Sequence, residues 1–385
     1  MFVQNTVDSD TPITENSENI EQVVLPDACE DAESPCDFAA LLQQHTAQLQ
    51  NELAEAKAKI AKLEARVFEL KQRCSYLEKA AAPFCIEQFK YNNEDLQFYT
   101  GLSSYGDFIK LLHYLKPDQK KDDENALNLK RGVGRPSVLT IENQLFMVLV
   151  SLRLGFFQKD LGHRFNIHQS TVSRLFNDWI NHMFDRLTDL PMWPSRAIVD
   201  KNMPDEFKKY PKTRVIFDAT EIECEVPSSF VLQSETYSNY KSSNTFKGLV
   251  GVSPDGTLNF LSPLVTGSVS DRELVKRSRF LKLPFEQGDV VMADKRFTIR
   301  DLLEPLGVQL NMPPFLRTPQ FTEQQVAQTE TIASLRIHVE RRIQRIKSFH
   351  IFDRRIPLTI APIINQVWTV CALLTNFQTP LLKSP

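Results

Sequence analysis

The longest regular pattern in the chain is a heptad repeat of apolar residues within residues 38–82. It runs through six heptads without Gly or Pro, and charged residues flank it. Its two core series are Ala39, Thr46, Leu53, Ile60, Val67, Cys74 and Leu42, Leu49, Ala56, Leu63, Leu70, Leu77. A repeat of 3.5 residues over this length predicts a left-handed coiled coil. The branched residues Ile60 and Val67 in the first core series, with leucines in the second, favour a parallel homodimer through residues 39–77. A single amphipathic helix docked on the rest of the protein is the alternative.

A second helical pattern fills residues 138–190. Leu145, Val148, Leu149 and Leu152 recur at helical spacing, and two shorter helical patterns follow, Gln158–Phe165 and Gln169–Ile180. The break at residues 166–168 predicts a tight turn and hence a helix-turn-helix, with Ser170 expected to cap the second helix. The polar side of that helix offers hydrogen-bonding side chains suited to base edges and phosphates: Gln169, Ser170, Thr171, Ser173, Arg174 and Asn177. A plain helical hairpin is the alternative.

Residues 210–378 change to a mixed pattern of strands and helices. Short β-branched runs predict strands at residues 214–218, 245–252, 257–261, 288–294 and 308–311, with a hairpin turn at residues 253–256. Helices are predicted at residues 298–306, 331–349 and 359–377. The fold class predicted for this part is therefore α/β.

The other segments are polar. Residues 1–37 are acidic and predicted to be disordered, because they cannot bury enough apolar area to offset chain entropy. Residues 84–137 predict short helices followed by a basic linker. In that linker Arg135 stands in a Gly-Arg-Pro tripeptide that can enter a narrow minor groove, although a simple basic linker explains it as well.

The net charge of −3 conceals an uneven distribution. Ten of the 48 acidic residues lie within residues 1–40, which contain no Lys or Arg, so residues 41–385 carry 45 basic against 38 acidic residues, a net +7. This basic body fits a nucleic-acid partner. The six cysteines form no C-x-x-C pair, which favours a reducing compartment, the nucleus or the cytoplasm. Neither a secretory signal nor a membrane-spanning segment is expected from the apolar runs.

Three carboxylates are candidates for chemistry. Asp218 and Asp294 end predicted strands, and Glu340 lies beside the apolar stripe of a predicted helix. If they converge, they form a hard, oxygen-rich site suited to Mg²⁺ or Mn²⁺, and two such ions catalyse phosphodiester cleavage. Basic residues near these acids would neutralise DNA phosphates: Lys241, Lys247, Arg341 and Arg345. Each acid alone could instead be a turn residue, and Asp271 could be only a helix cap.

From about residue 96 to 377 the chain resembles the PIF/Harbinger-like, THAP-associated DDE transposases. The matching motifs occur in order: FYTGL (98–102), FNIHQSTVSRLF, MWPS (192–195), FDATEIECEVPSS, YKSSNTFKGLVGVSPDGTLNFLSP, GSVSD, VMADKRF, PPF (313–315) and RIHVERRIQRIK. The resemblance implies an RNase H-like catalytic domain preceded by a helix-turn-helix. It also implies a metal site at Asp218, Asp294 and Glu340, with an auxiliary role for Asp271.

Two departures from the family keep a second hypothesis open. Arg296 stands where the family motif has glycine, and residues 1–37 lack the Cys and His spacing of a THAP zinc finger. The first hypothesis is a metal-dependent DNA endonuclease and transposase, which could need an accessory DNA-binding protein. The alternative is a domesticated, transposase-derived nuclear DNA-binding protein with weak or no catalysis. A zinc hydrolase is disfavoured, because His338 and His350 have no partners at metal-ligand spacing.

Overall fold

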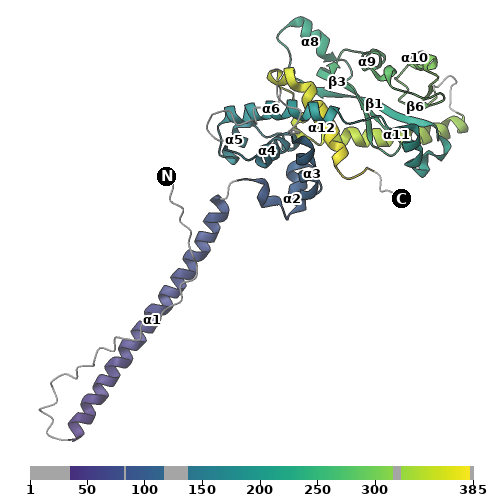
Figure 1. Ribbon diagram of the computed structural model, residues 1–385. Helices are drawn as coiled ribbons and strands as arrows, with labels where there is room; N and C mark the ends of the chain where they lie inside the picture. The colour runs from purple at the N-terminus through teal and green to yellow at the C-terminus, as the bar shows by residue number, and fades with distance from the viewer. Residues whose placement is uncertain (1–34, 82–83, 117–137, 315–321, 382–385) are drawn as a thin grey trace. The chain divides into compact units, whose positions relative to one another are not determined.

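The computed structural model describes residues 35–81, 84–116, 138–314 and 322–381 (Figure 1). The chain divides into two compact units, residues 1–82 and residues 83–385. The predicted acidic arm falls outside the described residues except for its last three, which begin a helix. Arg135 and most of the predicted basic linker also lie outside them.

The first unit contains one long helix, α1 (Pro35–Ala81). The helix predicted from the heptad repeat is therefore confirmed, and its pairing with a second copy stays a prediction. Leucine, isoleucine and valine side chains at the heptad core positions are exposed on this helix: Leu42, Leu49, Leu53, Ile60, Leu63, Val67 and Leu70. Such a continuous apolar stripe is costly to leave in water.

The second unit begins with helices. In chain order they are η1 (Ile86–Phe89), α2 (Asn93–Thr100), α3 (Tyr105–Leu115), α4 (Ile141–Leu154), α5 (Gln158–Arg164), α6 (Gln169–Thr188), α7 (Arg196–Lys201) and η2 (Asp205–Lys209). Side chains of Asn92, Ser104 and Thr140 accept hydrogen bonds from the first turns of α2, α3 and α4, which fixes where these helices start. The predicted helical block is confirmed, whereas α7 was not predicted.

A mixed sheet follows. Its strands are β1 (Thr213–Glu223), β2 (Tyr237–Ser238), β3 (Ser243–Val252), β4 (Leu258–Leu261), β5 (Val265–Thr266), β6 (Val290–Met292) and β7 (Gln309–Asn311). The strand order is β2-β3-β1-β6-β7, and β4 and β5 also pair with β3. β1 runs antiparallel to β3 and parallel to β6, which is parallel to β7. The predicted α/β class is confirmed, and β2 and β5 are additions to the predicted strands.

The remaining helices lie between the strands in sequence or follow the last of them. They are α8 (Phe230–Thr236), α9 (Asp271–Arg277), η3 (Phe280–Lys282), α10 (Arg300–Leu303), η4 (Glu304–Leu306), α11 (Glu323–Lys347), η5 (His350–Phe352), η6 (Leu358–Ile363), α12 (Ile364–Leu374) and η7 (Thr375–Phe377). The expected cap at Asp271 is wrong by one residue: the hydroxyl of Ser270 accepts the hydrogen bond from the Glu273 amide, and Asp271 is the first helical residue. The α11 helix begins eight residues earlier than predicted.

Alternation along the strands divides the core between the two faces of the sheet. Val215 and Phe217 pack with α9 and α10 on one face. Ile216 and Ile222 pack with α11, α12 and the helices of residues 86–187 on the other. The helical part and the sheet part therefore share one core. As in any strand, residues two apart lie on the same face, so Asp218 lies on the α11 side.

One described stretch, Leu358–Phe377, is helical, long and apolar enough to cross a membrane by length and composition. This is weak evidence for a membrane span, because the stretch includes α12, which packs inside the body. Trp368 and Cys371 are completely buried, and the Trp368 indole donates a hydrogen bond to the Ser262 carbonyl at 3.2 Å.

Candidate active site and DNA-binding surface

The parallel pairing of β1 with β6 aligns two of the predicted acids. Ile216 lies opposite Met292, and each is followed two residues later by an aspartate, Asp218 in β1 and Asp294 just after β6. Both aspartates therefore lie on the α11 face of the sheet. The Asp218 carboxylate accepts a hydrogen bond from the Ala219 amide at 2.9 Å, and that of Asp294 accepts one from the Lys295 amide at 2.6 Å.

Arg336 of α11 bridges the two aspartates. One of its terminal nitrogens is 3.5 Å from an Asp218 carboxylate oxygen, and the other is 3.9 Å from an Asp294 oxygen. The third guanidinium nitrogen, Nε, is buried and has no hydrogen-bond partner. Arg336 is not among the site residues predicted from the sequence. Its role as a bridge depends on how α11 packs on the sheet, which no local sequence pattern shows.

The Asp218 carboxyl is hard to ionise. Burial raises its pKa from 3.8 to about 6, and Arg336 and the Ala219 amide oppose that rise only in part. The nearby charge of Asp294 raises the pKa further. A cation close to these carboxylates therefore favours their ionised form, which is the electrostatic requirement of a metal site.

The third predicted acid stands apart from the first two. Glu340 is exposed on α11, one turn after Arg336. In the part of the chain that the structure describes, no group of three His, Cys, Asp or Glu side chains is close enough to hold a metal ion. The structure thus brings Asp218 and Asp294 together and leaves Glu340 outside the pair. The donors of this pair are carboxylate oxygens, which are ligands of the kind that Mg²⁺ and Mn²⁺ prefer.

Arg296, which replaces the family glycine, contacts the second aspartate. Its Nε donates a hydrogen bond to an Asp294 carboxylate oxygen at 3.0 Å, and its guanidinium lies 5.2 Å from the centre of the Tyr240 ring. Among the described residues the non-glycine positions with positive φ are Asn166, Ser242 and Arg279. Arg296 is not one of them, so the backbone there does not need a glycine, and the replacement changes charge rather than backbone conformation.

A polar cavity of about 730 Å³ opens beside Asp218. At its wall the Lys247 ammonium is 3.3 Å from a Glu221 carboxylate oxygen and 3.5 Å from an Asp271 oxygen. Lys247 is buried. The two carboxylates balance its charge, although the sequence predicted that it would bind a DNA phosphate. Lys241 lies exposed on the rim. Asp271 meets Lys247 rather than the Asp218–Asp294 pair.

The basic helix α11 uses several of its arginines internally. The Arg342 guanidinium is buried and donates hydrogen bonds to the carbonyls of Gly256 and Thr375. Arg345 is half-buried and donates to the Thr379 carbonyl, whereas Arg341 is exposed. Of the two arginines predicted to meet DNA on this helix, Arg341 is free to do so, and Arg345 is partly engaged in holding the chain terminus.

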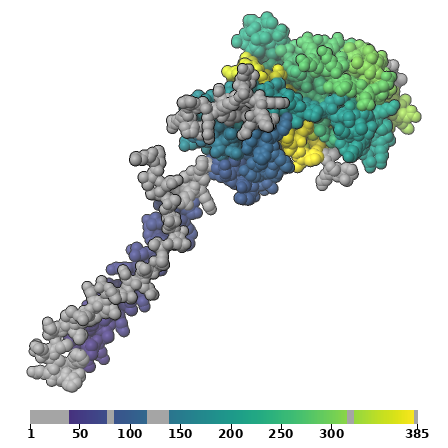
Figure 2. Space-filling model, viewed as in Figure 1, coloured from purple at the N-terminus to yellow at the C-terminus, as the bar shows by residue number. Residues whose placement is uncertain are grey.

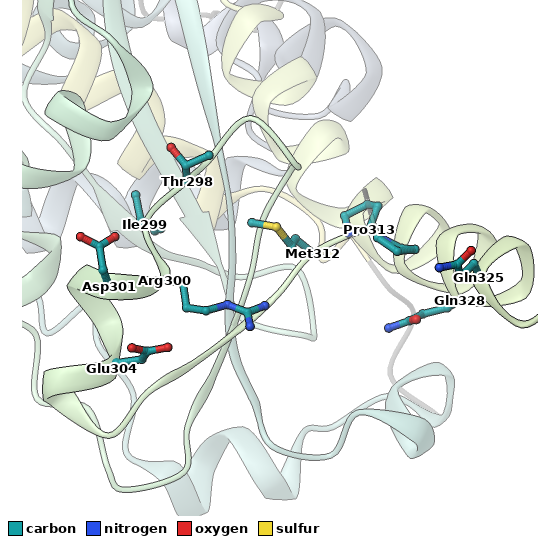
Figure 3. Close-up of a pocket in the computed structure, with 10 residues that line it drawn as sticks. Thr298, Ile299, Arg300, Asp301, Glu304, Met312, Pro313, Gln325 and Gln328 are labelled. Atoms are coloured by element: carbon teal, nitrogen blue, oxygen red, sulfur yellow. The ribbon is translucent and has the colours of Figure 1, made fainter. Parts of the chain in front are cut away.

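A second cavity of about 730 Å³ adjoins the first at Thr298. Figure 3 shows its labelled side chains coming from residues 298–304, from the segment after β7 and from the first turns of α11. Arg300 points into it. The carboxylate of Asp301, also on its wall, is held by Arg272 in two hydrogen bonds of 2.7 and 2.6 Å.

The helix-turn-helix is built as predicted, with one correction. α5 and α6 meet at a tight turn in which Gly162 approaches the Ile167 carbonyl so closely that a Cβ would lie 2.8 Å from it. The cap of α6 is His168 rather than Ser170: its ring Nδ1 accepts a hydrogen bond from the Ser170 amide at 3.2 Å. The sequence pattern favours Ser170 over His168 as the cap, because hydroxyl and carboxylate side chains are the usual caps of helices.

The polar side of α6 faces outward. Gln169, Ser170, Arg174 and Asn177 are exposed, and Thr171 and Ser173 are half-exposed. The opposite side, including Val172, Phe176, Trp179 and Ile180, is buried in the core. The first turns of α6 therefore present the hydrogen-bonding side chains that a recognition helix needs.

Comparisons with known protein families agree with these two parts. Residues 217–376 match the family described as DDE superfamily endonuclease, and the β1–β7 sheet is consistent with an RNase H-like fold. Residues 137–189 match the family described as helix-turn-helix of DDE superfamily endonuclease. No curated protein matches the chain significantly. The chain therefore carries a DDE superfamily endonuclease domain together with its helix-turn-helix domain.

Proposed function

We propose that the protein is a nuclear, PIF/Harbinger-like DNA transposase whose endonuclease domain cleaves and transfers DNA strands with divalent metal. The observation that carries this proposal is the pairing of Asp218 with Asp294 on the sheet face covered by α11. The motif order of residues 96–377 supports the narrower family assignment. The helix-turn-helix supports DNA as the substrate.

Asp218 and Asp294 would hold the metal, and Glu340, which lies outside this pair in the structure, would have to move to join them. A divalent cation held there would supply the activation of an attacking water or 3′-hydroxyl and the charge stabilisation of the leaving oxygen. The chain itself supplies orientation and charge. Arg336 lies between the two carboxylates and balances part of their negative charge, and α6 holds the duplex through its exposed polar side chains. Cleavage forms a bond between phosphorus and the attacking oxygen and breaks the bond between phosphorus and the leaving oxygen. The proton lost by the attacking water or hydroxyl is balanced by the proton that the leaving oxygen gains.

Two copies of the chain would act together. The exposed apolar stripe of α1 is the basis for this, because a parallel coiled coil would bury it. A two-fold dimer would present two helix-turn-helix domains to two DNA ends, with the half-site spacing set by its symmetry.

The test is metal-dependent nicking of supercoiled plasmid and of duplexes carrying the ends of the gene's own element. We expect nicking with Mg²⁺ or Mn²⁺, loss of nicking with a chelator, and loss in Asp218→Ala. Asp205→Ala is the matched control, because Asp205 is an exposed aspartate on η2. Wild-type protein that neither nicks any of these DNAs nor binds Mn²⁺ would refute the proposal.

Arg296 favours a second function, DNA binding without efficient cleavage. Its guanidinium neutralises Asp294 from within the site, where a metal would otherwise be the countercharge. Under this alternative the wild type binds duplex DNA but does not nick it, and Arg296→Gly gains nicking. Equal nicking by both proteins would exclude the alternative.

A further inference from the structure

The cavity beside Asp218 has features that duplex binding and metal binding leave unexplained. It is lined by the end of β1, by residues 238–241 and 267–272, by Arg296 and by Lys347. Its volume of about 730 Å³ lies within the range of about 300–1,000 Å³ that is usual for sites that enclose a small ligand. A group of nucleotide size can therefore enter it beside the first catalytic aspartate.

Two lysines give this cavity an excess of positive charge. The charge of Lys247 is balanced by Glu221 and Asp271. Lys241 and Lys347, by contrast, have no carboxylate within 4 Å among the described residues. The Lys347 ammonium donates one hydrogen bond to the Glu221 carbonyl at 2.9 Å. Burial and the neighbouring charge of Lys241 lower the pKa of Lys347, and the charges of Glu221 and Glu223 oppose that change. An anion between the two lysines would stabilise both charges. A phosphate is such an anion.

An exposed aromatic ring stands at the same place. Tyr240 is 71% exposed, and the Lys241 ammonium and the Arg296 guanidinium lie 5.4 and 5.2 Å from its ring centre. The neighbouring helix α8 protrudes from the body (Figure 2) and carries Phe230, which is 87% exposed. Exposed aromatic rings beside cations are typical of surfaces that bind single-stranded nucleic acid, where bases stack on the rings.

We propose that this cavity binds an unpaired nucleotide of the DNA strand next to the bond that is cleaved. The base stacks on Tyr240, and the phosphate lies between Lys241 and Lys347. Paired bases in a duplex hide their faces, so the site selects DNA that is opened beside the scissile phosphate. The inference rests on the proposed function, since it names the form of DNA that the same active site accepts.

The test compares two labelled DNAs of the same sequence by fluorescence anisotropy, in chelator to prevent cleavage. One is a blunt duplex, and the other is a forked duplex whose end is unpaired. We expect the wild type to prefer the forked DNA. Tyr240→Ala should lose that preference by roughly 5- to 150-fold, the usual effect of losing one stacked base, and Tyr240→Phe should keep it. Binding of the blunt duplex, which α6 provides, should not change.

Tyr91→Ala is the matched control. Tyr91 is 92% exposed and also has a lysine, Lys90, 5.5 Å from its ring centre, but it does not line the cavity. This variant should bind both DNAs like the wild type. Equal affinity of the wild type for both DNAs, or an equal loss in Tyr240→Ala and Tyr91→Ala, would overturn the inference.

The outcomes separate this inference from the proposed function. If Tyr240→Ala retains the forked preference while Asp218→Ala abolishes metal-dependent nicking, the endonuclease proposal stands and the nucleotide site is wrong. If the forked preference depends on Tyr240 but no metal-dependent nicking occurs, the cavity still binds unpaired DNA in a protein that does not cleave it. A protein that binds neither DNA contradicts both.

Discussion

The raised pKa of Asp218 predicts that a single isosteric change stabilises the protein at neutral pH. In the folded protein this pKa is about 6, against 3.8 for an unperturbed aspartate. A folded pKa above the unfolded value favours folding at low pH, and that contribution is lost as the pH rises through about 6. Asp218→Asn removes the ionisation and keeps the shape of the side chain. Its stability relative to the wild type should therefore increase with pH.

The size of the effect follows from the shift. Each pH unit between the two pKa values is worth about 1.4 kcal/mol, so a shift of about two units amounts to roughly 3 kcal/mol. The difference in unfolding free energy between Asp218→Asn and the wild type should grow by that amount between about pH 4 and pH 7, and then level off. Carboxylates that do not interact with Asp218 titrate equally in both proteins and cancel in the difference.

Urea unfolding followed by tryptophan fluorescence measures this difference. The three tryptophans of the chain, Trp179, Trp193 and Trp368, all lie in residues 83–385, so the signal reports the body and not α1. Mn²⁺ at about 100 times its dissociation constant should stabilise the wild type by about 3 kcal/mol at neutral pH and the variant by much less. A stability difference that does not change with pH would refute the assigned burial of Asp218. Equal stabilisation of both proteins by Mn²⁺ would refute its role as a metal ligand.

Three further predictions concern other parts of the molecule. Arg296→Gly should tighten Mn²⁺ binding by roughly 5-fold in calorimetry, because the substitution removes a half-exposed cation from beside Asp294. Lys295→Gly should leave Mn²⁺ affinity unchanged, and equal effects of the two substitutions would contradict a specific role for the Arg296 guanidinium. Leu63→Asp should convert a dimer into a monomer in light scattering, because Leu63 is at a heptad core position. Phe68→Asp is the control and should leave the dimer intact, because Phe68 is equally exposed (64% against 65% for Leu63) but lies outside the heptad core. Arg174→Ala should weaken duplex binding if the exposed Arg174 guanidinium contacts a phosphate. The slope of log affinity against log salt concentration should then fall by about one unit, and an unchanged slope would show that Arg174 does not contact the DNA.

Local patterns predicted most of the fold because its elements carry strong periodicity. β1 alternates between two buried faces, and the β3–β4 hairpin is marked by a Pro-Asp-Gly turn. The elements that were missed have weaker signals. α8 exposes Phe230 and its neighbours to solvent, so it has no apolar stripe facing a core. The first turns of α11 are polar, although Thr322 and Gln325 form a capping box that could have located the start of the helix.

The candidate site was predictable only in part. The prediction that both acids end strands is correct for Asp294, which follows β6, and wrong for Asp218, because β1 continues to Glu223. The parallel register of β1 and β6 explains why the two aspartates meet. Arg336 and Tyr240 could not be identified in the same way, because each acquires its role from a contact across the fold. Arg336 is 118 residues from Asp218 in sequence, and nothing near it distinguishes it from the other arginines of α11.

The positive charge of residues 41–385 has a more specific meaning than its sum of +7 suggests. Of the seven Lys and Arg residues between residues 334 and 355, most are bound within the protein. Arg336 neutralises the two aspartates, Arg342 and Arg345 hold backbone carbonyls, and Lys347 donates to the Glu221 carbonyl. Because an internally bonded guanidinium contributes its field but not a new contact, α11 acts mainly as a positively charged support of the candidate site. Under the proposed function, direct contact with DNA would then depend on exposed residues of α6 and of the cavity rim, where substitutions should change affinity without unfolding the protein.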